Sequence, residues 1–139
     1  MNPRNIIIHH SLTKDGKTVS WNAIRKYHIG LGWRDIGYHY GIELVGDVYE
    51  ISVGRMMNES GAHCKQQGMN YKSLGICCIG NFDVDLVPEK QWQLCLTLVR
   101  SLVDVLPLSI DNIYGHNEFA YYKSCPGTNW SMNKFRSEI

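Results

Sequence analysis

The chain has 139 residues, which fits one domain built around one hydrophobic core. Apolar residues make up 44% of the sequence, an ordinary share for a globular protein. Fourteen lysines and arginines against thirteen aspartates and glutamates give a net charge of +1, which is too small to draw the protein strongly to nucleic acid or to an anionic membrane.

The N-terminal segment predicts a buried strand followed by a helix. Residues 6–9 are apolar and β-branched up to the histidine, without polar alternation, as in a strand that is covered on both faces. A turn at 14–17 precedes Ser20, which can cap a helix over 21–29 that Gly30 ends. The opening run of isoleucines is too short for the core of a signal peptide, so we expect synthesis in the cytoplasm without an export signal.

The middle of the chain predicts a hairpin, a long loop and a second buried strand. Residues 40–44 and 48–53 flank a Gly-Asp pair, which is typical of a β-hairpin. Residues 54–72 show no sustained periodicity and are rich in Gly, Asn, Gln and Ser, which indicates a long surface loop of the kind that often carries function. Residues 74–79 predict a strand in which Gly75 indicates a close backbone approach.

The C-terminal half predicts the longest helix, a third strand and a short closing helix. Pro88 opens a helix to about Val105, whose apolar residues form a stripe wide enough to pack on a sheet. Residues 110–114 predict a core strand, and residues 132–139 predict a short helix. Strands interleaved with helices predict an α/β fold, a sheet with helices on its faces.

The five cysteines indicate free thiols rather than a disulfide framework. Cys77 and Cys78 are adjacent in an apolar run, so a strand would send them to opposite faces, where they suit small buried hydrophobic side chains. A reducing compartment is the simpler interpretation, and a pairing of Cys64 stays open.

A histidine and a cysteine lie nine residues apart near the end of the chain, in a stretch rich in turn residues. His116 stands in Gly-His-Asn-Glu, and Cys125 stands in Lys-Ser-Cys-Pro-Gly. Far upstream, His9 and His10 close the isoleucine run, and neighbouring strand residues face opposite sides, so one of the two can be a ligand. Two imidazoles and one thiolate suit zinc and leave a fourth position for water. The spacing alone does not choose between the two histidines.

Cys125 has two other interpretations. It could be a buried free cysteine, or a nucleophile with His116 as its base. Pro126 and the lack of a helix start after it argue against an activated thiolate. Since the chain has no Cys-x-x-Cys pair, an open catalytic metal site is favoured over a structural four-ligand site.

Three further residues gain meaning only from their neighbours. Tyr38, by itself, would be aromatic packing at a strand start. Lys123 would by default be a solvated surface lysine, but beside a metal it becomes a candidate for stabilising an oxyanion. His63 lies in Gly-Ala-His-Cys within the long loop, and both a structural and a functional interpretation are open.

Seven short segments follow one another in a characteristic order. They are Ile-Ile-Ile-His-His-Ser at 6–11, Gly-Trp-Arg-Asp-Ile-Gly-Tyr-His-Tyr at 32–40, Gly-Ala-His at 61–63, Ser-Leu-Gly-Ile at 73–76, Gly-Asn-Phe at 80–82, Gly-His-Asn-Glu at 115–118 and Lys-Ser-Cys-Pro-Gly at 123–127. In their order and spacing, these segments resemble the zinc-dependent type 2 N-acetylmuramoyl-L-alanine amidases, a family with a T7 lysozyme-like and a peptidoglycan-recognition-protein-like branch. The resemblance covers about residues 6–130.

The resemblance implies a single domain over residues 1–139, with a mixed central β-sheet flanked by helices and a zinc in a groove on one face. It implies that the zinc ligands are His9, His116 and Cys125, and so it favours His9 over His10. His10 stands where other members often have a small residue.

The resemblance also implies roles for two residues beside the metal. Tyr38 matches the family's active-site tyrosine, and Lys123 matches the catalytic lysine of the T7-like branch. Many members carry an aspartate before the Pro-Gly pair, where this chain has Cys125, as the T7-like and recognition-protein branches do.

The activity implied by the resemblance is zinc-dependent hydrolysis of the amide bond between the lactyl group of N-acetylmuramic acid and L-alanine. We expect a monomeric phage-type endolysin that acts on peptidoglycan in the cell wall after release by a holin. A recycling enzyme or an injected effector would also fit a chain without an export signal. We expect no nucleic-acid and no membrane partner, since no window approaches the roughly 18 apolar residues of a membrane helix.

The alternative function is a peptidoglycan-binding module without turnover. Amidase folds that lose the cysteine ligand keep the groove and bind, but Cys125 and Lys123 are both present here, which favours the enzyme.

Overall fold

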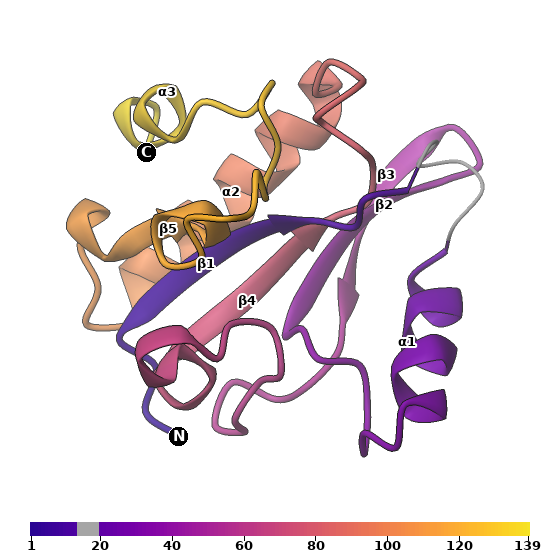
Figure 1. Cartoon of the computed structure of the whole chain (residues 1–139). Helices are drawn as coiled ribbons and strands as arrows, with labels where there is room; N and C mark the ends of the chain where they lie inside the picture. The colour runs from indigo at the N-terminus through magenta and orange to yellow at the C-terminus, as the bar shows by residue number, and fades with distance from the viewer. Residues whose placement is uncertain (14–19) are drawn as a thin grey trace.

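A five-stranded mixed sheet runs through the molecule in the order β3-β2-β4-β1-β5 (Figure 1). The computed structural model describes residues 1–13 and 20–139, so the turn predicted at 14–17 lies outside it. β1 is parallel to both of its neighbours, β4 and β5, and β2 pairs parallel with β4 and antiparallel with β3. The strands are β1 Asn5–His10, β2 Tyr40–Val45, β3 Val48–Val53, β4 Ser73–Cys78 and β5 Ile113–Gly115. The predicted α/β fold with a mixed central sheet is confirmed.

Helices cover the two faces of this sheet. α2 (Glu89–Val105) and α3 (Met132–Ser137) contribute side chains to the larger core cluster on one face, while α1 (Trp21–Gly30) packs Trp21 against the other. The Ser20 hydroxyl accepts a hydrogen bond from the backbone N–H of Ala23 at 3.2 Å, which is the predicted cap of α1. Three short 3₁₀ helices complete the described elements: η1 Gln66–Tyr71, η2 Ile110–Asn112 and η3 His116–Glu118.

The alternation of β1 decides which of its side chains can reach the site. Ile6 and Ile8 belong to the core cluster that includes α2 and α3, whereas Ile7 packs with Cys64 and Met69 of the 54–72 segment on the opposite face. Since side chains two residues apart share a face, His9 points to the same side as Ile7. The candidate site therefore lies on the face that α1 and the 54–72 segment cover.

The strand predicted at 110–114 is wrong in its first half. Ile110–Asn112 form one turn of 3₁₀ helix, and β5 begins only at Ile113. The cause is a local cap, because Asn112 Oδ1 accepts a hydrogen bond from the backbone N–H of Ser109 at 2.9 Å. The 54–72 segment is likewise not a plain loop, since η1 lies within it.

The structure describes all five cysteines, and each is a buried free thiol. This agrees with the prediction of unpaired thiols and closes the question of a disulfide at Cys64. Within residues 1–13 and 20–139, the helices are too short or too polar to cross a membrane.

Candidate active site

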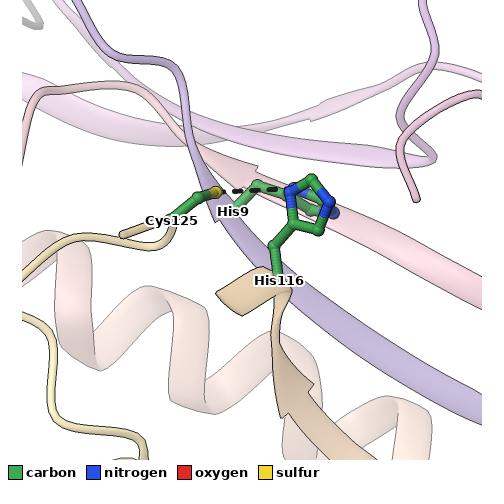
Figure 2. A group of neighbouring side chains, drawn as sticks. All are labelled: His9, His116 and Cys125. Atoms are coloured by element: carbon green, nitrogen blue, oxygen red, sulfur yellow. Dashed lines mark hydrogen bonds between the residues drawn. The ribbon is translucent and has the colours of Figure 1, made fainter. Parts of the chain in front are cut away.

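Three side chains that are far apart in the sequence meet at one end of the sheet. His9 lies near the end of β1, and His116 follows β5 directly. Because β1 and β5 are parallel neighbours, the carboxyl ends of both strands lie together, and the two imidazole rings are 4.6 Å apart between centroids. The chain then returns through a loop that brings Cys125 to the same point (Figure 2).

The donor atoms of these residues have the spacing of a metal site. One ligand atom from each of His9, His116 and Cys125 lies within 4.8 Å of the other two. Cys125 Sγ is 3.6 Å from His9 Nδ1, and a tetrahedral zinc with ordinary bond lengths separates a sulfur from a nitrogen ligand by about 3.6 Å. Two imidazoles and one thiol are also the soft, borderline donors that zinc accepts, so the residues present fit the metal.

Burial sets the protonation of the three side chains. It lowers the pKa of His9 well below its usual value and the pKa of His116 to about 4, so both rings are neutral at neutral pH, the form that binds metal. Burial raises the pKa of the Cys125 thiol to about 12. A thiol with so high a pKa is a poor nucleophile, and it becomes a thiolate only when a cation compensates its charge. The electrostatics therefore favour a metal ligand over the Cys–His nucleophilic pair.

The loop that carries Cys125 is held by hydrogen bonds to both neighbouring segments. The backbone N–H of Asn117 donates to the Cys125 carbonyl at 2.7 Å. Asp83, which follows β4, accepts from the Ser124 hydroxyl at 2.6 Å and from the Thr128 backbone N–H at 2.9 Å. These bonds lower the pKa of Asp83, and they fix the loop on either side of the thiol.

A hollow of about 430 Å³ opens in front of the cluster. Tyr38, Trp33 and Lys123 line it together with the three clustered residues. A second hollow of about 220 Å³ shares Trp33, Lys123 and Tyr122 with the first, so the two form one groove. The size and mixed lining of this groove suit an extended ligand that has both polar and apolar parts.

The two residues assigned a catalytic role by resemblance both line the groove. The ring of Tyr38 lies 5.2 Å from that of His9 between centroids, and burial raises the pKa of its phenol well above the usual value, so the hydroxyl keeps its proton. Lys123 is exposed at the rim, two residues before Cys125. The structure thus brings together all five of the predicted site residues.

His10 and His39 turn away from the cluster into backbone contacts. His10 Nδ1 accepts from the backbone N–H of Phe82 at 3.1 Å, and His39 Nδ1 accepts from that of Gly75 at 3.0 Å. Both rings are buried, and each hydrogen bond ties its segment to a neighbouring one, although His10 also lines the hollow described above.

His63 is the residue whose role the sequence left open. Its Nδ1 lies 3.0 Å from His9 Nε2, and its Nε2 donates to the Ser73 carbonyl at 3.3 Å. Burial lowers the pKa of His63 to about 3, so the ring is neutral. Its position in a segment without periodicity hid this contact, and the Gly-Ala-His sequence was the only signal that could have found it.

Comparison with known proteins places the chain among cell-wall amidases. The sequence profile of the N-acetylmuramoyl-L-alanine amidase family matches residues 1–128. The chain is 32% identical to the endolysin of Escherichia phage T7 over 141 aligned residues, which cover 93% of this chain and 86% of that protein. It is 35% identical over 130 residues to peptidoglycan-recognition protein SC2 of Drosophila melanogaster, covering 88% of this chain and 67% of that one.

Solved structures show the same fold. N-acetylmuramoyl-L-alanine amidase LysC from Clostridium intestinale aligns with 99% of this chain and 85% of its own, with a TM-score of 0.84 and 28% identity. Drosophila PGRP-LB, solved as a point mutant in complex with tracheal cytotoxin, aligns with 93% of this chain and 78% of its own, with a TM-score of 0.75 and 29% identity.

Proposed function

The chain belongs to the N-acetylmuramoyl-L-alanine amidase family, and from this premise we propose that it is a phage-type endolysin that cleaves peptidoglycan with a zinc held by His9, His116 and Cys125. The bond cleaved is the amide between the lactyl group of N-acetylmuramic acid and L-alanine. The observation that carries the proposal is the meeting of two neutral imidazoles and one thiol, with donor atoms within 4.8 Å of one another, beside a groove. All three ligands come from one chain, so the site needs no second copy of the protein.

When bound, zinc would supply a Lewis acid that lets water act as a nucleophile near neutral pH. The chain supplies the rest of the chemistry. The phenol of Tyr38, protonated and beside His9, is placed to orient the attacking water or to pass on its proton. Lys123 at the groove rim offers a positive charge to the oxyanion that develops on the substrate carbonyl.

The groove would select the substrate by shape and by mixed polarity. Its second hollow extends beyond Lys123 along the 54–72 segment, where Gln66 donates a hydrogen bond to the Tyr122 hydroxyl at 3.0 Å. This contact joins two loops that are far apart in the sequence, at the lining of the second hollow. We assign the extension to the peptide or glycan on one side of the scissile amide.

Digestion of purified peptidoglycan followed by mass spectrometry tests the reaction. We expect peptides that begin with a free L-alanine amine, together with glycan whose lactyl groups are unsubstituted. Intact lactyl–alanine linkages after incubation with the zinc-loaded protein would contradict the proposal, and retained binding to the polymer would then favour a binding module.

Metal content tests the ligand assignment separately. The Cys125→Ala protein should lose both zinc, measured by mass spectrometry of the metal, and hydrolysis of peptidoglycan. His10→Ala is the matched control, because His10 is the neighbouring imidazole on β1 that bonds to the Phe82 backbone instead. If Cys125→Ala keeps full activity and its metal, the assignment of the ligands is wrong.

A further inference from the structure

His63 contacts the Nε2 side of the His9 ring, whereas Cys125 lies on the Nδ1 side, so His63 is outside the three-ligand cluster. Two glycines border the space that its ring fills. The two imidazoles meet edge to face, with centroids 5.0 Å apart and an angle of 88° between their planes. A Cβ placed on Gly75 would lie 2.6 Å from His63 Cγ, and one placed on Gly61 would lie 2.4 Å from His63 Cδ2. Any larger residue at either position would displace the ring, so the two glycines leave the space that the imidazole of His63 fills.

The backbone around His63 is fixed as well. Asn70 Oδ1 accepts hydrogen bonds from the backbone N–H groups of both His63 and Cys64, at 2.7 and 2.8 Å. The ring therefore does not depend on its own hydrogen bonds for its position. What those bonds decide is where the hydrogens lie.

A chain of hydrogen bonds runs from β4 through His63 to His9. The Ser73 carbonyl can only accept, so His63 Nε2, 3.3 Å away, carries the hydrogen. A neutral ring then has an unshared pair on Nδ1, and His9 Nε2, 3.0 Å from it, must donate. The remaining nitrogen of His9, Nδ1, is left with its unshared pair, and it is this atom that lies 3.6 Å from Cys125 Sγ.

We infer that His63 is a positioning residue that holds His9 in the Nε2–H tautomer, so that His9 presents Nδ1 to the metal. The inference rests on the proposed function in one respect, the assignment of His9 as a ligand. A metal-binding histidine commonly donates its second N–H to an acceptor that fixes the ring and raises its basicity, and loss of that acceptor typically weakens metal binding by about 10- to 100-fold. Here the acceptor is itself a histidine, whose tautomer is set by its hydrogen bond to the Ser73 carbonyl.

Two substitutions separate this role from simple packing. In His63→Gln, the side-chain carbonyl can accept from His9 and the amide N–H₂ can donate to Ser73, so both ends of the chain of hydrogen bonds are kept. His63→Leu fills a similar volume but offers no acceptor. Titration of the metal-free proteins with zinc against a chromophoric chelator should show His63→Leu about 10- to 100-fold weaker than the original protein, with most of the loss recovered in His63→Gln.

If His63 served only for packing, His63→Gln should bind zinc more weakly than His63→Leu. Leucine is the better buried hydrophobic residue, whereas glutamine would leave polar atoms in the core. Circular dichroism of each variant establishes that it is folded before the titration. Equal zinc affinity in all three proteins, or a weaker His63→Gln than His63→Leu, would overturn the inference.

The tautomer itself can be observed without any metal. Long-range ¹H–¹⁵N correlation spectra of the original protein, labelled at histidine and depleted of zinc, should show His9 protonated at Nε2 and unprotonated at Nδ1. A His9 ring protonated at Nδ1 would overturn the inference, whatever zinc affinities the variants show. This measurement uses only the original protein, so it holds even if His63→Leu fails to fold. A contrary order of zinc affinities, or a contrary tautomer of His9, would contradict the role of His63 and leave the amidase proposal intact. His9→Ala with unchanged zinc content would instead refute the proposed metal site.

Discussion

At the scale of single residues, we expect Lys123 to separate turnover from metal binding in the proposed site. It lines both hollows of the groove but is not one of the three clustered ligands. Lys123→Ala should therefore keep its zinc while the rate of peptide release falls about 100- to 1000-fold, the usual cost of losing one donor to an oxyanion. Metal analysis and timed digestion of peptidoglycan measure the two effects.

The control is Lys90→Ala, since Lys90 lies on α2 beside a separate hollow near β3. It should leave both zinc content and rate unchanged. If Lys123→Ala releases peptide at the original rate, the lysine is only a surface charge, as its exposure alone would indicate.

Tyr38 has a hydroxyl that can be removed without changing the size of the ring. Tyr38→Phe should keep the fold and the zinc, because the phenol is not among the clustered donors. Its turnover should fall by about 100-fold or more, a typical effect of losing a group that positions or transfers a proton. Comparison of kcat with KM on a soluble muropeptide checks this: a change in KM alone would assign Tyr38 to substrate binding.

Asp83 links the acid stability of the protein to the loop that carries Cys125. Its hydrogen bonds to Ser124 and Thr128 hold the pKa of the carboxyl below its usual value. The stabilisation is therefore fully present above the unfolded-state pKa of about 4 and is lost as the pH falls through the lower, folded-state value.

Asp83→Ala should lower the free energy of unfolding by about 1 kcal/mol at neutral pH, at the low end for bonds to a charged group because the carboxyl is partly exposed. Urea unfolding at a series of pH values measures the difference. We expect it to be constant at neutral pH and to shrink below about pH 4; a difference that persists unchanged at pH 2 would mean that the charge of Asp83 plays no part.

At the scale of elements, α1 docks onto β2 through a contact that only glycine permits. A Cβ on Gly41 would lie 2.3 Å from ring carbons of Trp21, which is the buried residue of α1. Gly41→Ala should therefore push α1 away from the sheet and lower the free energy of unfolding by roughly 1–3 kcal/mol, the range for overpacking a core.

The matched control is Gly30→Ala at the end of the same helix, where an added Cβ meets nothing within 4 Å. That change should be neutral or slightly stabilising, because it only restricts the unfolded chain. Thermal unfolding of the two variants measures this difference. Equal transition temperatures would show that Trp21 adjusts to the added methyl group without loss of stability.

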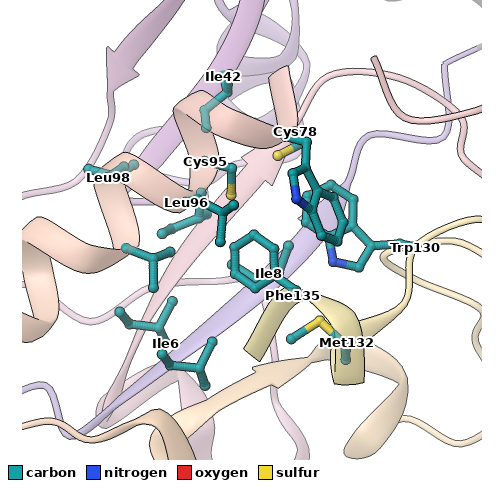
Figure 3. Packing of buried hydrophobic residues seen from close by; sticks show 14 of the residues in the cluster. Ile6, Ile8, Ile42, Cys78, Cys95, Leu96, Leu98, Trp130, Met132 and Phe135 are labelled. Carbon is teal, nitrogen blue, oxygen red and sulfur yellow. The ribbon is translucent and has the colours of Figure 1, made fainter. Parts of the chain in front are cut away.

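The elements that the sequence predicted well are those with a long regular pattern. The wide apolar stripe of α2 predicted a helix against a sheet, and Figure 3 shows Cys95, Leu96 and Leu98 from α2 in the core beside the strand residues Ile6 and Ile8. The first half of the strand predicted at 110–114 failed because a side-chain cap, invisible to hydrophobic periodicity, bends that stretch into η2.

At the scale of the whole molecule, a common location for His9 and His116 could be predicted because each lies at the carboxyl end of a strand, and neighbouring parallel strands end together. Cys125 could be proposed as a ligand from its turn and its distance of nine residues from His116, whereas the choice of His9 over His10 came only from the resemblance. His63 escaped assignment for a different reason: its partner is another candidate ligand, and a hydrogen bond between two imidazoles leaves no trace in the spacing of the sequence.

The proposed zinc ties the first strand to the last loop, and this makes metal binding a property of the folded chain. His9 and Cys125 are 116 residues apart, so the unfolded chain cannot hold both donors with His116 around one ion. Zinc at a free concentration of 100 times its Kd should stabilise the native state by about 2.7 kcal/mol, which raises Tm by roughly 9 °C for a chain of this size.

Thermal unfolding with zinc and after chelation measures this increment. Lys123→Ala should keep it, because the lysine is not a ligand, and Cys125→Ala should lose it, because two imidazoles alone bind zinc far more weakly. A rise in Tm that is equal in the original protein and in Cys125→Ala would place the ion elsewhere on the molecule. A rise confined to proteins with all three donors would mean that the metal is bound where the sheet, the loop and the groove converge.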